Sequence, residues 1–107
     1  AKYWAINLHC MSMGTAIVAL SRTLASLKQR MLDTGVTPDR IDIITGWGKR
    51  SRVVGSSLVK QAVEDTLNAL SSPFHVENSN MGCFVGIGQA LVDWLYVSDM
   101  DKVHMLT

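Results

Sequence analysis

Helical spacing of apolar residues marks the first long segment of the chain. After Ser12, the apolar positions are 13, 16, 17, 20, 24, 27 and 31. This spacing gathers them on one side of a helix, with Ser12 as its N-cap. Gly35 and Pro38 follow, and they predict the end of the helix because glycine suits the C-terminal cap and proline cannot continue the backbone hydrogen bonding.

A second helix is predicted between a serine pair and a proline. Ser56 or Ser57 provides the N-cap, and Ser71-Ser72-Pro73 breaks the pattern. The apolar stripe between them consists of Val59, Val63, Leu67 and Leu70. Residues 88–96 predict a third, shorter helix, which ends before a polar terminal segment.

Four short segments predict β-strands. Residues 3–8 are rich in strand-forming side chains, and residues 41–45 are a largely β-branched run. Residues 74–77 alternate between apolar and polar, and residues 83–87 follow a predicted turn at 78–82.

The order of these elements indicates an α/β fold. Strands that alternate with helices favour a parallel pair joined by a right-handed crossover, whereas the last two strands are close enough for a hairpin. We therefore expect a two-layer β-α-β-α-β-β sandwich with a mixed four-stranded sheet and a short C-terminal helix. The 107 residues suffice for one domain, 1–107, and the abrupt start suggests that it is excised from a larger protein.

Composition narrows the class of protein further. Apolar residues make up 48% and charged residues 18%, which argues against disorder. No run of 18 apolar residues is present, so we expect no membrane-spanning helix, and no signal peptide is visible. Cys10 and Cys83 are too few for a disulfide framework, so we expect buried thiols in a reducing compartment.

Charge is divided unevenly along the chain. Residues 1–63 hold nine Lys or Arg and three Asp or Glu, whereas residues 64–107 hold one and six. This division favours a basic face that attracts phosphates. A solvated charge distribution without a partner is the alternative.

Candidate chemistry gathers where the first two strands end. His9 follows the first strand, and Gly46-Trp47-Gly48 follows the second. Ligands of open α/β sheets bind beyond the carboxyl ends of strands, close to helix N-termini that favour anions. The adjoining cations Lys49, Arg50 and Arg52 could contact phosphates, and Trp47 could stack on an unpaired base. The loop is not a Walker A loop, because Gly48-Lys49 is followed by arginine.

Two motifs resemble those of Smr (small MutS-related) domains. Ile6-Asn7-Leu8-His9 resembles the Leu-Asp-x-His motif of that family. Thr45-Gly46-Trp47-Gly48 resembles its His-Gly-x-Gly motif in the Thr-Gly-x-Gly form, which is similar to Smr domains at the C-terminus of plant pentatricopeptide repeat proteins. The likeness continues through 49–52, Asn80-Met81-Gly82 and Trp94-Leu95, and so covers nearly the whole chain.

The resemblance implies a nucleic-acid-binding domain, with DNA nicking or RNA endonuclease activity in some members. It also implies a parent protein with RNA-binding repeats, located in the chloroplast or alternatively the mitochondrion. Residue by residue, it makes His9, Asn7 and Thr45 the candidate catalytic residues. His9 would transfer a proton, Asn7 stands at the family's acidic position, and Thr45 stands at the first position of the second motif. Gly46 and Gly48 would let backbone N–H groups approach a phosphate closely.

Three classes of function follow. The chain is an RNA endonuclease that cleaves phosphodiester bonds, a non-catalytic RNA- or DNA-binding module, or a protein-interaction module. Single-stranded RNA is the expected partner, with DNA as the alternative. We expect no cofactor, with magnesium as the alternative, because no paired carboxylates reach this edge and Asp42 is expected near the opposite end of its strand. A zinc site is not expected, since the three histidines are far apart in the sequence.

Overall fold

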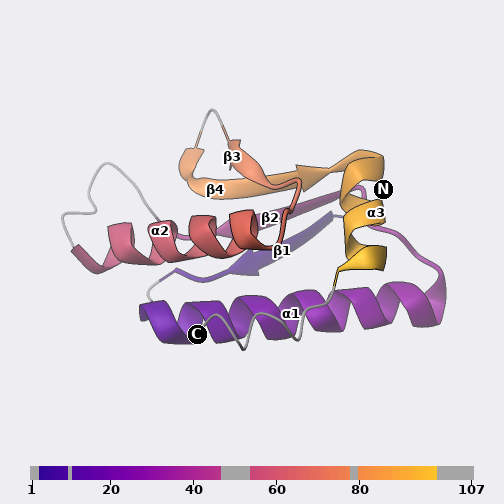
Figure 1. Cartoon of the computed structure of the whole chain (residues 1–107), viewed down its shortest axis with the longest axis horizontal. Coiled ribbons are helices and arrows are strands. Elements are labelled where there is room, and N and C mark those ends of the chain that lie inside the picture. Colours follow the sequence, from indigo (N-terminus) through magenta and orange to yellow (C-terminus); the bar gives the residue numbers. More distant parts are fainter. Residues whose placement is uncertain (1–2, 10, 47–53, 78–79, 99–107) are drawn as a thin grey trace.

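The computed structural model describes residues 3–9, 11–46, 54–77 and 80–98 of the chain. Its elements follow the predicted order of strands and helices (Figure 1). They are β1 (Tyr3–Asn7), α1 (Met13–Thr34), β2 (Arg40–Ile44), α2 (Val54–Ala69), β3 (His75–Glu77), β4 (Asn80–Ile87) and α3 (Gly88–Val97).

The four strands form one mixed sheet in the order β1-β2-β4-β3. β1 and β2 are parallel, whereas β4 is antiparallel to both of its neighbours, β2 and β3. The predicted fold class, an α/β sandwich with a mixed four-stranded sheet and a short C-terminal helix, is therefore confirmed.

Helix α1 begins and ends at the residues that the sequence indicated. The side chain of Ser12 accepts a hydrogen bond from the backbone N–H of Thr15, which satisfies one of the free donors of the first turn. Gly35 adopts a left-handed conformation, with φ of 74°, and its N–H donates to the carbonyl of Met31. Glycine reaches this conformation without the steric cost of a Cβ atom, so the helix ends here.

All three helices pack against one face of the sheet. Side chains of β1, β2 and β4 that point to this face join the apolar stripes of the helices in one core. α1 and α2 run alongside the strands, and α3 stands across them at one end of the sheet (Figure 1). The fully buried members include Leu8, Leu20, Leu24, Met31, Ile41, Ile43, Val63, Leu91 and Leu95. Burial of each such side chain contributes roughly 1.5–3 kcal/mol.

Several predicted boundaries differ from the structure. Helix α2 begins at Val54, before the predicted serine caps, and β3 begins at His75. Strand β4 begins at Asn80, inside the predicted turn, because Asn80 pairs with Glu77 of β3. Met13 was predicted on the apolar stripe but is half exposed, since the buried stripe begins one turn later, at Ala16. Among the described helices, none is long and apolar enough to cross a membrane.

Candidate functional site

The carboxyl ends of β1 and β2 lie next to each other at one edge of the sheet. Asn7 is paired with Ile44 in the parallel register. One residue further, the N–H of Leu8 donates to the carbonyl of Ile44 at 2.7 Å. The chain then leaves both strands, so His9 and Gly46 emerge at the same edge, as predicted.

His9 and Gly46 are in direct contact. A Cβ atom added to Gly46 would lie 1.8 Å from Nδ1 of His9 and 2.8 Å from both Cγ and Cε1. The imidazole ring therefore occupies the space that any other residue's side chain would need. Gly46 also has a φ of 80°, a conformation that L side chains rarely adopt. The backbone conformation thus favours glycine at this position, and a larger residue would also force the His9 ring to move.

Asn7 supports His9 through the backbone. Its Oδ1 accepts a hydrogen bond from the backbone N–H of His9 at 2.9 Å, the arrangement of an Asx turn. The strand alternation ends at Leu8, because His9 already lies in the turn. Asn7 thus holds the point at which His9 leaves the strand.

Thr45 lies below the surface. Its side chain is 2% exposed, and both its N–H and its hydroxyl donate to the carbonyl of Gly82, at 2.7 and 3.1 Å. Two bonds to one carbonyl of β4 hold the backbone immediately before Gly46. The geometry therefore gives Thr45 a positioning role at this edge.

The N-terminus of α1 completes the described part of the site. Ser12, which caps the helix, lies three residues after His9, and the first turn carries no acidic side chain. The free N–H groups and the dipole of such a terminus favour an anion. A shallow, largely open depression of about 800 Å³ extends from this terminus along α1. Its lining consists of Ser12, Gly14, Thr15, Val18, Ala19, Arg22 and Thr23.

Five of the predicted site residues lie outside the described residues. They are Trp47, Gly48, Lys49, Arg50 and Arg52. Within the described ranges, no three His, Cys, Asp or Glu side chains gather in a way that could hold a metal ion.

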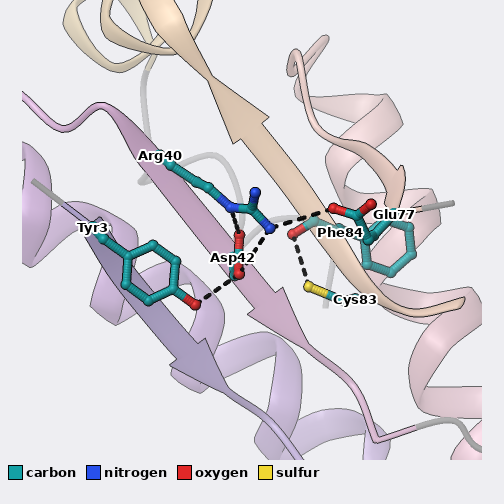
Figure 2. A network of polar contacts seen from close by, with 6 residues as sticks. All are labelled: Tyr3, Arg40, Asp42, Glu77, Cys83 and Phe84. Carbon is teal, nitrogen blue, oxygen red and sulfur yellow. Dashed lines mark hydrogen bonds and ion pairs between the residues drawn. The ribbon is translucent and has the colours of Figure 1, made fainter. Parts of the chain in front are cut away.

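A second polar cluster lies on the face of the sheet opposite the helices, as Figure 2 shows. The Tyr3 hydroxyl donates to Oδ2 of Asp42 at 2.7 Å. The Arg40 guanidinium donates to both oxygens of Asp42 and reaches Oε2 of Glu77 at 3.3 Å. Asp42 is 7% exposed and sits in the middle of β2, not near its end as predicted. Its charge is compensated by three hydrogen bonds, so the cluster stabilises this face of the sheet.

Hydrogen bonding and burial shift pKa values in and beside this cluster. The hydrogen bond to Asp42 is the main cause that raises the pKa of Tyr3, and the same bond partner raises the pKa of Arg40. Burial is the main cause that raises the pKa of the Cys83 thiol. A thiol with a raised pKa is less nucleophilic at neutral pH. Cys83 is buried, as predicted. Cys10 lies outside the described residues.

Sequence reasoning missed this cluster, although a signal was present. Arg40 and Asp42 are two residues apart in a strand, so they share a face. That they share it with Tyr3 and Glu77 depends on the pairing of four strands, which the sequence alone did not specify.

Comparison with known proteins finds relatives that are named pentatricopeptide repeat-containing proteins. The chain is 58% identical over 105 residues to pentatricopeptide repeat-containing protein At1g74750 of Arabidopsis thaliana, which covers 98% of this chain and 12% of that protein. Protein At1g79490, mitochondrial, is 32% identical over 73 residues, covering 68% of this chain and 8% of its own length. Protein At4g16390, chloroplastic, is 29% identical over 96 residues, covering 89% and 13%. Both carry the same pentatricopeptide repeat-containing designation, and both are from Arabidopsis thaliana.

These similarities show that the chain is homologous to part of pentatricopeptide repeat-containing proteins. Nearly all of it corresponds to a segment of pentatricopeptide repeat-containing proteins, and it spans about an eighth of the length of the first relative, 12%. No protein-family model matches the chain.

Proposed function

We propose that this chain is an Smr-type domain of a pentatricopeptide repeat protein, and that it binds and cleaves single-stranded RNA at the edge formed by His9 and Gly46. The observation that carries the proposal is the contact between the His9 imidazole and Gly46. It brings together the two motif segments that resemble the family, at the carboxyl edge where α/β sheets bind ligands.

RNA can be cleaved at such a site with few catalytic groups. The 2′-oxygen attacks the adjacent phosphorus and its proton passes to His9, while the bond from phosphorus to the 5′-oxygen breaks. The products are a 2′,3′-cyclic phosphate and a 5′-hydroxyl, whose proton comes from His9 or solvent. Proton transfer by one positioned imidazole contributes roughly 10²–10⁴-fold. The nucleophile belongs to the substrate, so the first step needs neither an activated water nor a metal.

The remaining described residues position these groups. Asn7 holds the backbone of His9, and Thr45 holds the backbone before Gly46 through β4. We assign both residues positioning roles, because Oδ1 of Asn7 and the hydroxyl of Thr45 are hydrogen-bonded to the backbone. The absence of a side chain at Gly46 lets the His9 ring lie directly against the backbone.

Binding is assigned to the basic loop and to α1. Lys49, Arg50 and Arg52 would neutralise the phosphates, the backbone N–H of Gly48 would approach one of them closely, and Trp47 would stack on a base, as the sequence predicts. The open depression along α1 supports this assignment, because it begins at Ser12, three residues after His9 in the sequence, and contains the cation Arg22. Single-stranded RNA is the proposed partner and DNA the alternative.

The parent protein is proposed to act in an organelle. Two relatives carry the words mitochondrial and chloroplastic in their names. Of the two, we propose the chloroplast, as the resemblance to plant Smr domains implies, with the mitochondrion as the alternative.

Cleavage of a labelled single-stranded RNA tests the proposal. We expect the 107-residue chain to cut it in the presence of a chelator, and His9→Ala to lower the rate by roughly 10²-fold or more while RNA binding persists. The matched control is Thr37→Ala, an exposed residue in the loop at the opposite edge of the sheet, which should cut at the wild-type rate. Activity lost with chelator and restored by magnesium would overturn the metal-free route.

The non-catalytic alternative has its own signature. If wild type binds RNA without cutting it, and if the triple alanine variant of Lys49, Arg50 and Arg52 abolishes that binding, the chain is a non-catalytic domain that binds RNA through its phosphates. Equal cleavage by wild type and His9→Ala would assign the chemistry to another residue.

A further inference from the structure

A small pocket lies between α2 and β3, away from the edge that carries His9. Its volume is about 180 Å³, which suits one planar ring system. Three separate parts of the chain line it: two successive turns of α2, residues 74–76 at the start of β3, and one residue of β4. The lining residues are Glu64, Leu67, Asn68, Phe74, His75, Val76 and Phe84.

The aromatic wall of the pocket is fixed in place. Phe74 meets Trp94 edge-on, with ring centroids 5.7 Å apart. The indole N–H of Trp94 in turn donates to the carbonyl of Leu70 at 3.0 Å, which ties α3 to the end of α2. Behind the wall, Val76 pairs with Phe84 in the sheet. The pocket therefore exists before any ligand binds, which lowers the entropic cost of binding.

The polar groups of the pocket come from successive turns of α2. Glu64 and Asn68 are four residues apart, so they lie on the same helix face, with Leu67 beside them. Glu64 is half-buried, and within the described ranges no hydrogen bond or ion pair involves its carboxylate. A carboxylate accepts hydrogen bonds only, and two neighbouring donors satisfy it best.

Among the RNA bases, guanine matches this arrangement. Its Watson–Crick edge presents two adjacent donors, N1–H and the N2 amino group, whereas the other three bases place an acceptor beside their donor. Proteins read unpaired bases by stacking them on aromatic side chains and bonding that edge. The carboxylate would meet the base edge and not the phosphate, so its charge does not oppose binding of the strand.

The pocket is within reach of the proposed cleavage site. Phe84 is level with Ile43 in the sheet, three residues before Gly46, and β3 lies two strands from β2. Strand spacing and rise give a separation on the order of 15 Å. One short stretch of extended RNA can therefore occupy both places.

From this geometry we propose that the pocket between α2 and β3 binds an unpaired guanine of the RNA, and so adds a base preference to the domain. The inference rests on the proposed function for the choice of RNA as the ligand. The ring of Phe74 supplies the stacking surface, and Glu64 accepts from N1–H and N2–H. Asn68 supplies a further donor for the guanine carbonyl.

Titration of the 107-residue chain with free nucleosides, followed by amide NMR shifts, tests the pocket. We expect guanosine to shift the resonances of residues 64–68 and 74–76, and inosine, which lacks the amino group, to bind more weakly. Glu64→Gln should weaken guanosine binding roughly tenfold or more. Asp65→Asn removes the same charge from the neighbouring exposed position and should bind like wild type.

Other results would overturn the proposal. Adenosine or inosine shifting the same resonances as strongly as guanosine would remove the base preference. Free arginine binding there more tightly than guanosine would assign the pocket to a protein partner. A nucleoside carries no phosphate and is not cleaved, so this result does not depend on whether His9 is catalytic.

Discussion

At the scale of single residues, the site depends on one missing side chain. Gly46 shares its left-handed conformation with Gly35, but only Gly46 has a histidine ring where its Cβ would lie. Substitutions at the two glycines would therefore share the backbone strain, and only the one at Gly46 would also displace the His9 ring. This difference makes Gly35 the natural control for a substitution at Gly46.

We predict that Gly46→Ala lowers RNA cleavage by roughly 10²-fold, because the imidazole must move by an ångström or more and misplacement of that size is costly. Gly35→Ala has comparable φ strain, with no atom within 4 Å of its Cβ, and both variants should lose about 1–2 kcal/mol of stability. Cleavage rates measured together with urea unfolding check this. Equal cleavage by the two variants would show that the contact with His9 does not matter for the reaction.

The sequence could indicate that His9 and Gly46 meet at one edge, because both follow strands that it predicted as parallel. It could not indicate that the ring lies on Gly46, since that contact depends on the Asx turn at Asn7 and on the bonds of Thr45 to β4. Thr45 illustrates the limit most clearly. From the motif it was a candidate catalytic group, whereas in the fold its hydroxyl is buried and bonded.

At the scale of elements, the sheet carries helices on one face and a polar cluster on the other. The cluster connects β1, β2 and β3 through the side chains of Tyr3, Arg40, Asp42 and Glu77 (Figure 2). The Tyr3 hydroxyl donates a hydrogen bond to Asp42. Its contribution to the stability of the folded chain therefore depends on the hydroxyl remaining protonated. A pH dependence of stability follows.

The pKa of Tyr3 is raised in the folded chain above its ordinary value of 10.0. A raised pKa means that the folded state holds the proton more tightly than the unfolded state does. The stabilisation from the Tyr3 hydrogen bond is therefore complete below pH 10, and it is lost as the pH rises through the pKa of Tyr3 in the folded state. We predict that wild type is more stable than Tyr3→Phe at pH 8, and that the difference shrinks above pH 10.

Urea unfolding of both proteins at several pH values measures this difference. Tyr96→Phe, which removes an exposed hydroxyl on α3, is the matched control. A difference between wild type and Tyr3→Phe that stays constant through pH 11 would contradict the assignment of the hydrogen bond to Asp42.

At the scale of the whole molecule, all described elements except the short edge strand β3 contribute buried residues to one core. Leu24 on α1 is fully buried, whereas Leu32 on the same helix is 51% exposed. The pair distinguishes packing from helix propensity, because both substitutions replace leucine by alanine within α1.

We predict that Leu24→Ala lowers the free energy of unfolding by about 2–5 kcal/mol, since it leaves a cavity in the shared core. Leu32→Ala should change it by about 0.5 kcal/mol or less. Both variants and wild type should unfold in one cooperative transition, monitored by circular dichroism and by tryptophan fluorescence. Separate transitions for the two probes would contradict a single domain over residues 1–107.

The sequence by itself determined the kind and order of the elements, because apolar spacing, Ser12, Gly35 and Pro38 act within a few residues of their own position. It also indicated the edge at which His9 and Gly46 emerge. Only the tertiary structure decided which partners these residues have: the His9 ring over Gly46, Thr45 on Gly82, Asp42 among three strands, and the pocket between α2 and β3. Each of these contacts joins segments far apart in the chain, and no local pattern records which distant side chains the packing of the core will bring together.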